Sequence, residues 1–220
     1  MPIIGFVAQK GGAGKTTLAV HLSVVAGDAV LVDLDPQGSA AEWWDSREAE
    51  VPAIATGRPA DLGRSLAALT QQRRYVLVDT APFSDEHAEA VTRHADLVVI
   101  PTRPAILDLR AIRKTVKLVQ RVGTPAVIVL NAVPAGKSTA EASVVTAARV
   151  ALSAYGLPVC PISIGQRMAL QHALNDGRTV VEYEPDGKAA QEIRRLWRWI
   201  DEQVQVRLAG GRGRSSTPAA

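Results

Sequence analysis

The residues from Gln9 to Thr17 have the clearest chemical potential in the chain. They read Gln-Lys-Gly-Gly-Ala-Gly-Lys-Thr-Thr and lie between an apolar, β-branched segment, 3–8, and an amphipathic segment, 18–26. Glycines permit a tight turn with inward-pointing backbone N–H groups. The helix that follows presents unpaired N–H groups and the positive end of its dipole to an anion. The pattern therefore predicts a phosphate-binding loop between a strand and a helix.

Two lysines and a threonine in this loop suggest how a nucleotide would be held. Lys15 would reach the β- and γ-phosphate oxygens, and the Thr16 hydroxyl would join the shell of a Mg²⁺ ion. The usual P-loop pattern begins with glycine, but here Gln9 stands at that position and a second lysine, Lys10, follows. The alternative is a glycine-rich turn with an incidental lysine, which the flanking segments disfavour. We expect the phosphates on Gly11, Gly12, Ala13, Gly14, Lys15, Thr16 and Thr17.

Acidic residues end two further apolar segments. Asp33 and Asp35 follow the segment 29–32, and alternation along a strand places both on the same side. Asp79 ends the apolar segment 75–78. Carboxylates at the carboxyl edge of a parallel sheet can position Mg²⁺ and water beside a phosphate. Asp33 and Asp35 could instead cap a helix that begins near Ser39.

These segments together resemble the ParA/MinD family of P-loop ATPases (SIMIBI class). Residues 10–17 resemble its deviant Walker A motif, residues 33–37 its D-x-D-P-Q segment, and residues 75–79 its Walker B strand. The resemblance implies ATP and Mg²⁺ as cofactors and Lys10, Lys15 and Asp35 as catalytic residues. By resemblance, Lys10 crosses a homodimer interface to the other subunit's nucleotide, and Asp35 orients the attacking water. Thr16, Asp33 and Asp79 would serve Mg²⁺, the two aspartates through water.

Adenine recognition rests on the same resemblance and on weaker sequence signals. Asn131 follows the apolar segment 127–130, where relatives place a base-reading amide, and Pro161 and Ile162 fall where they close over the ring. An asparagine after a strand is also a common turn former. Both interpretations of Asn131 stay open from the sequence.

The rest of the chain predicts an α/β fold, a single-domain P-loop NTPase. Apolar segments at 3–8, 29–32, 75–78, 97–100, 126–130 and 158–164 indicate strands, and amphipathic segments between them indicate helices. Their alternation predicts a doubly wound, mainly parallel sheet with helices on both faces. Leu196, Trp199 and Val206 mark the apolar side of a last helix. We expect an ATPase domain over 1–208 and a flexible Gly/Arg/Ser-rich tail over 209–220.

Composition narrows the class of protein further. The 220 residues include 47% hydrophobic and 4% aromatic residues, and the one cysteine, Cys160, excludes a disulfide within the chain. No apolar segment approaches about 18 residues, the length of a membrane span. We therefore expect a cytoplasmic protein without a membrane partner.

The net charge of +3 conceals an uneven distribution. Acidic residues concentrate in 28–89, and basic residues dominate 103–137 and the C-terminal part. A basic ridge on one predicted helix comprises Arg110, Arg113, Lys114, Lys117 and Arg121. By family analogy we favour Arg167, Arg194, Arg195 and Arg198 as contacts to DNA. Taken alone, each cluster is more often an ordinary solvated helix face.

The resemblance implies a partition ATPase of the short ParA type, without an N-terminal helix-turn-helix domain. ATP-bound homodimers would bind non-specific duplex DNA on the nucleoid, and a ParB-like adaptor would stimulate hydrolysis and so relocate a cargo. One alternative is a MinD-like membrane-associated switch, which needs an amphipathic C-terminal helix. Another is a metabolic ATP-dependent enzyme on the same fold, which the second lysine, Lys10, disfavours.

Overall fold

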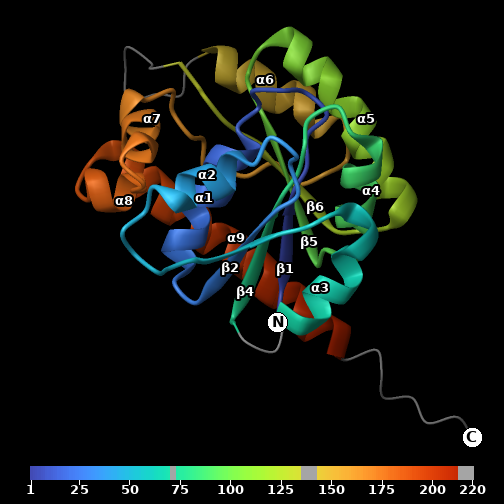
Figure 1. The fold of residues 1–220 in the computed structure, drawn as a ribbon. Coiled ribbons are helices and arrows are strands. Elements are labelled where there is room, and N and C mark those ends of the chain that lie inside the picture. The colour runs from blue at the N-terminus through green and yellow to red at the C-terminus, as the bar shows by residue number, and fades with distance from the viewer. Residues whose placement is uncertain (70–72, 135–142, 213–220) are drawn as a thin grey trace, which may run out of the picture.

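The computed structural model describes residues 1–69, 73–134 and 143–212 (Figure 1). Within these ranges, strands and helices alternate along most of the chain, as the sequence predicts. The strands are β1 (Ile3–Phe6), β2 (Ala29–Asp33), β3 (Ala53–Thr56), β4 (Tyr75–Asp79), β5 (Leu97–Thr102) and β6 (Ala126–Leu130). The helices are α1 (Lys15–Ala26), α2 (Ser39–Asp45), the 3₁₀ turn η1 (Pro59–Asp61), α3 (Leu62–Leu69), α4 (Asp85–His94), α5 (Ile106–Val122), α6 (Ser143–Ser153), α7 (Met168–Asn175), α8 (Val180–Tyr183) and α9 (Lys188–Arg212).

The strands of the described residues form one parallel sheet in the order β3-β2-β4-β1-β5-β6. Strand β1 lies inside the sheet, between β4 and β5, and the chain leaves it toward β2 and later returns to β5 on its other side. Such a reversal of strand order opens a crevice at the carboxyl ends of the strands. The register sets Phe6 and Asp33 opposite Asp79 on either side of β4, so three strands end at the same level.

Helices cover both faces of the sheet, which confirms the predicted doubly wound α/β class (Figure 1). One core, containing Phe6 and Leu77, packs against α1, α2, α7, α8 and α9. The other, containing Val78 and Ile100, packs against α3, α4, α5 and α6. Successive strand residues alternate between the two cores, as the period of two requires. No helix in the described part of the chain is long and apolar enough to cross a membrane.

One strand prediction was wrong, and one strand was not predicted. The segment 158–164 is not a strand, since isolated bridges join Val159 to Ile128 and Gly165 to Val133 at its ends. Strand β3 was not predicted, because its four residues, three of them partly buried and Thr56 exposed, include only one large apolar side chain, Ile54.

The last helix also differs in detail from its predicted pattern. Val206 is exposed, and Val204 takes the buried position instead. Helix α9 extends to Arg212, so it includes the first residues of the predicted tail. The remaining part of that tail, 213–220, lies outside the described residues.

Candidate nucleotide-binding site

The glycine-rich loop connects β1 to α1 at the carboxyl edge of the sheet. Gly12 and Gly14 adopt φ values of +70° and +96°, a left-handed conformation that favours glycine. Lys15 is the first residue of α1 and its side chain is buried. The loop therefore places the backbone N–H groups at the start of α1 beside one lysine ammonium. This arrangement is typical of an anion-binding site.

Thr16 and Asp79 join this loop to the end of β4. The Thr16 hydroxyl donates a hydrogen bond of 2.6 Å to Asp79 Oδ2. Burial raises the pKa of the Asp79 carboxyl to about 7, against the opposing effects of the Thr16 hydrogen bond and the Lys15 charge. Burial also lowers the pKa of Lys15, while Asp79 and Asp35 act to raise it. The charges of Lys15, Asp79 and Asp35 thus interact, and Thr16 is hydrogen-bonded to Asp79. We call these four side chains the Lys15 group.

The second oxygen of Asp79 suggests where a cation fits. Asp79 Oδ1 is buried and accepts no hydrogen bond from the residues that the structure describes. A divalent ion with its water shell would supply the missing partner and would favour the charged carboxylate. Mg²⁺ commonly takes one or two carboxylates together with substrate phosphates. Thr16 and Asp79 therefore fit a Mg²⁺ ion that accompanies a nucleotide.

Both carboxylate oxygens of Asp33 accept hydrogen bonds from backbone N–H groups. Its Oδ1 accepts from the backbone N–H of Asp35 at 2.9 Å, and its Oδ2 accepts from those of Ala40 and Ala41, both at 3.0 Å. The carboxylate thus caps the first turn of α2, which was the alternative interpretation. Its proposed service to a Mg²⁺-bound water stays a prediction. Asp35 is less buried, and its Oδ1 accepts from Gln37 N–H at 3.0 Å.

Asn131 braces the phosphate loop in this structure. Its Nδ2 donates a hydrogen bond of 2.9 Å to the Ala13 carbonyl, and its backbone N–H donates to Thr102 O. The side chain is buried beside Gly14. A role in reading adenine remains a prediction for Asn131.

The segment predicted to close over the adenine ring is held by α6. Arg149 donates to Cys160 O at 2.6 Å and to Pro161 O at 3.0 Å. Pro161 is exposed and Ile162 packs partly against the core. Adenine contact by Pro161 and Ile162 also stays a prediction.

Lys10 lies at the outer edge of the loop, away from the Lys15 group. Its side chain is 40% exposed, and its Nζ forms an ion pair of 2.9 Å with Asp108 Oδ2 on α5. Beside it, Gln9 Nε2 donates 2.7 Å to Asp85 Oδ1 at the start of α4. The sequence analysis missed both acidic partners, because nothing in the local pattern around Asp85 or Asp108 marks them as neighbours of the loop.

An exposed rim surrounds the outer edge of the loop. A Cβ atom built at Gly11 would lie 3.3 Å from the Phe83 ring, and one built at Gly12 would lie 3.3 Å from the Arg103 guanidinium. Phe83 is 75% exposed, and Ile106 and Leu107 in the first turn of α5 are each 68% exposed. We call Phe83, Arg103, Ile106 and Leu107 the loop rim.

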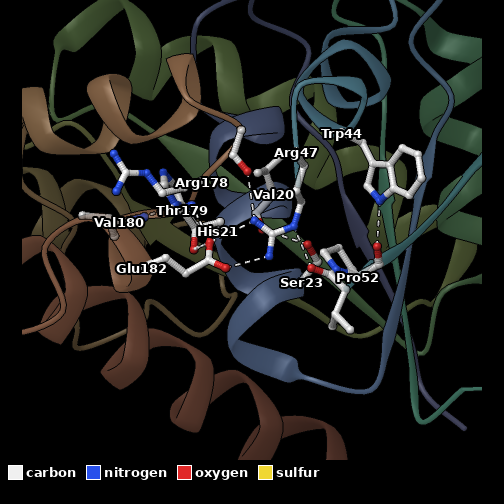
Figure 2. Close-up of polar contacts among 12 residues, drawn as sticks. Val20, His21, Ser23, Trp44, Arg47, Pro52, Arg178, Thr179, Val180 and Glu182 are labelled. Carbon is white, nitrogen blue, oxygen red and sulfur yellow. Dashed lines mark hydrogen bonds and ion pairs between the residues drawn. The ribbon is translucent and has the colours of Figure 1, made fainter. Parts of the chain in front are cut away.

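A polar network fixes the end of helix α2 against the C-terminal half of the chain (Figure 2). Arg47 donates to Glu182 through both terminal nitrogens, at 3.0 and 2.6 Å, and to Gly177 O at 2.9 Å. Glu182 also accepts from Thr179, in a capping box at the start of α8. Helix α2 directly follows residues 33–38, so this network holds the segment that carries Asp35.

His21 on α1 contacts the same region (Figure 2). Its Nδ1 accepts from Val180 N–H at 3.1 Å, which leaves Nε2–H to donate to Leu170 O at 3.1 Å. The ring is fully buried, and burial lowers its pKa to about 4. A neutral imidazole therefore joins α1 to α7 and α8.

The arginines predicted to contact DNA differ in exposure and in the partners that their side chains have within the chain. Arg167 forms a two-point ion pair with Glu192, with Nη2–Oε1 at 2.5 Å and Nε–Oε2 at 3.2 Å. Arg194 donates to Pro185 O at 2.6 Å, while Arg195 and Arg198 are exposed on α9. On the basic ridge of α5, Lys114 pairs with Asp85 and Arg121 with Glu89. Contact with DNA stays a prediction for every one of these residues.

The fold and the loop chemistry define a P-loop nucleotide-binding protein with a second lysine in its phosphate loop. The family described as "CobQ/CobB/MinD/ParA nucleotide binding domain" matches residues 4–180. The chain belongs to this family, and it is an ATPase of the ParA/MinD type with ATP and Mg²⁺ as cofactors.

Individual relatives agree with this assignment. The chain is 33% identical over 209 residues to "Maintenance of carboxysome distribution protein A" of Gloeobacter kilaueensis, covering 92% of this chain and 93% of that protein. It is 29% identical over 201 residues to the protein of the same name from Halothiobacillus neapolitanus, covering 85% and 90%. Among solved structures, the septum site-determining protein MinD of Pyrococcus horikoshii OT3, complexed with Mg-ADP, shares the fold. That match has a TM-score of 0.73 and 20% identity, and it covers 94% of this chain and 98% of MinD.

Proposed function

We propose that the ATP-bound chain forms a homodimer that binds non-specific duplex DNA and positions a cargo through an adaptor that stimulates hydrolysis. In this dimer, Lys10 of each copy reaches the nucleotide held by the other. ATP would hold the two copies together and hydrolysis would separate them, so nucleotide state would act as an association switch. The proposal would place the protein on the nucleoid.

The observation that carries this proposal is the position of Lys10. A lysine that served only its own nucleotide would point inward like Lys15, whereas Lys10 is partly exposed at the outer edge of the loop. The loop rim beside it exposes the side chains of Phe83, Ile106 and Leu107. Exposed apolar side chains gathered at one edge are typical of a protein contact. A second copy brought against this rim would meet the edge of the phosphate loop.

The chemistry asks the protein for positioning and charge stabilisation. The phosphoryl transition state is loose, so an oriented water and neutralised oxygens matter more than a strong base. Asp35 would orient that water, and Lys15 with Lys10 from the second copy would neutralise the developing charge. A cation supplied across an interface in this way is worth roughly 10³–10⁵ in rate when fully engaged.

Exposed arginines on α9 support the DNA-binding part of the proposal. Arg195 and Arg198 are available, and dimerisation would double the cationic surface offered to one duplex. Arg167 would contact DNA as well only if its guanidinium also bound a phosphate beside Glu192 or broke its ion pair with Glu192. Contacts of this kind go to phosphates and carry no base recognition. The basic ridge of α5 is the alternative face.

The names of the two sequence relatives bear on the cargo. Both are called carboxysome distribution proteins, so we favour a protein assembly over a plasmid as the cargo of this chain. The adaptor would then be a separate protein that bridges the ATPase to that assembly, in the role that ParB plays for DNA cargo. It would stimulate ATP hydrolysis and release.

DNA binding in different nucleotide states tests the proposal. The protein with a non-hydrolysable ATP analogue should bind unrelated duplexes alike and much more tightly than with ADP. Its log–log salt slope should be about −0.9 per phosphate neutralised. Replacing Arg194, Arg195 and Arg198 by Glu should abolish this binding without affecting ATP-dependent association, and the matched control is Arg113→Glu with Lys117→Glu on α5.

The outcomes separate the alternatives. Loss of binding only in the α5 control would move the DNA face to the basic ridge. Equal binding by wild type and both variants would contradict DNA binding through these arginines. Co-sedimentation with anionic liposomes in place of DNA would support the membrane-associated alternative.

A further inference from the structure

Lys10 is held by its own chain through Asp108. The 2.9 Å ion pair joins a side chain that is 40% exposed to a carboxylate whose side chain is 8% exposed. Asp108 lies in the first turn of α5, where its N–H donates to Ala105 O and the helix dipole favours a negative charge. The carboxylate is therefore the buried member of the pair, and the lysine is the more exposed one.

Asp108 lies in surroundings where Lys10 is needed to neutralise its charge. Apolar residues, among them Ala8, Ala13, Ile100 and Ile112, make up much of the lining of a small cavity beside the pair, which Thr115 also lines. Thr115 lies two turns along α5, and its buried hydroxyl has no hydrogen-bond partner among the described residues. If Lys10 moved away, a nearly buried carboxylate would lose its cation in a mostly apolar wall. Leaving a buried charge unpaired is costly.

Lys10 cannot hold Asp108 and reach another subunit's nucleotide with the same ammonium at once. We propose that Asp108 is a positioning residue that keeps Lys10 on its own chain and so restrains ATP-dependent association and turnover. The inference rests on the proposed function, in which Lys10 acts across the dimer. Within that function, Asp108 sets how much ATP-bound protein is needed before two copies associate.

Removing the charge of Asp108 tests this inference. Asp108→Asn keeps the shape but weakens the hold on Lys10. It should lower the protein concentration for half-maximal association with an ATP analogue by roughly tenfold, equivalent to about 1.4 kcal/mol. Basal turnover should rise in step. Affinity for a labelled nucleotide on the single chain should not change, because Asp108 does not touch the Lys15 group.

Two comparisons separate this role from a structural one. Thr115→Val changes the same cavity without touching Lys10 and should associate like wild type. When Lys10 is already replaced by alanine, adding Asp108→Asn should change neither ATP-dependent association nor basal turnover. Asp108→Ser provides a second charge-removing variant, should Asp108→Asn fail to fold.

A measurement on the single chain keeps the inference distinct from the proposed dimer. The rate at which Lys10 is acetylated by a mild reagent, followed by peptide mass spectrometry without nucleotide, should rise several-fold in Asp108→Asn. An unchanged rate, or weaker association in a folded variant, would overturn the inference. A third outcome is faster labelling of Lys10 in Asp108→Asn together with no ATP-dependent association in any variant or in the wild type. This outcome would contradict the dimer proposal, but it would still support the ion pair by which Asp108 keeps Lys10 on its own chain.

Discussion

The Asn131 side chain lies so close to Gly14 that no Cβ atom fits between them. A Cβ built at Gly14 would sit 1.9 Å from Asn131 Nδ2, the atom that also donates to Ala13 O. The residue that follows β6 thus fixes the curvature of the phosphate loop after β1. Gly14 is required both by its φ of +96° and by this contact.

Gly14→Ala should therefore abolish nucleotide binding while the protein stays folded. The new methyl group must displace Asn131, and the backbone N–H groups of the loop then no longer point toward one phosphate site. Gly123→Ala is the matched control, since Gly123 also adopts a left-handed conformation but a Cβ there meets no atom of the described residues within 4 Å. The control should cost about 1 kcal/mol of stability and retain binding of a fluorescent ATP analogue. Equal affinity of Gly14→Ala and wild type would contradict this account of the loop.

Lys15→Gln should reduce the affinity for nucleotide, ADP included, below detection, because the loop loses the buried ammonium beside Asp79 and Asp35. Lys10→Ala should bind nucleotide on the single chain like wild type, since Lys10 pairs with Asp108 instead. Isothermal titration with ADP and Mg²⁺ measures both. Loss of binding in Lys10→Ala would indicate that Lys10 serves its own nucleotide.

His21 should make the protein less stable in mild acid. Its folded pKa of about 4 lies below the unfolded value of 6.5, so the unfolded chain binds more protons between these values. Stability from the neutral ring is thus complete above about pH 6.5 and is lost as the pH falls toward 4, by about 2 to 3 kcal/mol. The difference between wild type and His21→Gln in urea unfolding, measured at pH 7.5 and 4.5, isolates this effect from other groups. Identical pH dependence in both proteins would refute it.

Arg47→Ala should destabilise the protein by about 3 kcal/mol, since its guanidinium side chain is 3% exposed and its loss removes the Arg47 donor from Glu182 Oε1 and from Gly177 O. Arg73→Ala is the control: its 3.5 Å pair with Asp28 is exposed, at 42% and 56%, and should be worth less than about 1 kcal/mol. Thermal unfolding compares the two variants. Similar small losses in both would mean that the network in Figure 2 does not anchor α2.

The phosphate loop and the two acidic strand ends were predictable because each is a local pattern. A strand, a turn with glycines and a helix start occupy consecutive residues, and β2 and β4 are long enough to show apolar runs. Strand β3 gives no such signal, because Ile54 is its one large apolar residue. The segment 158–164 is apolar enough for a strand, but only Val159 pairs with β6 and Gly165 with Val133.

The pairings across the site were not predictable, because they join residues far apart in the sequence. Arg47 and Glu182 are 135 residues apart, and Asn131 reaches Ala13 over 118. The pair of Lys10 and Asp108 is of the same kind. Asp33 shows a different limit. Its place at the end of β2 was expected, and capping of the following helix was one of two interpretations left open by the sequence. The position of the α2 backbone donors, which depends on how the chain turns at Gly38, could not be read from the sequence.

The molar mass of Asp35→Ala with ATP and Mg²⁺ tests the central claim most directly. Asp35 takes no part in the hydrogen bond between Thr16 and Asp79. Removing its carboxylate should therefore leave ATP bound but leave the attacking water without a group to orient it. Light scattering with ATP should then give a stable species of twice the 23.3 kDa chain mass, and ADP should return it to a single chain. Lys10→Ala with Asp35→Ala should remain single. An Asp35→Ala protein that binds ATP tightly yet keeps the mass of one chain would contradict the account.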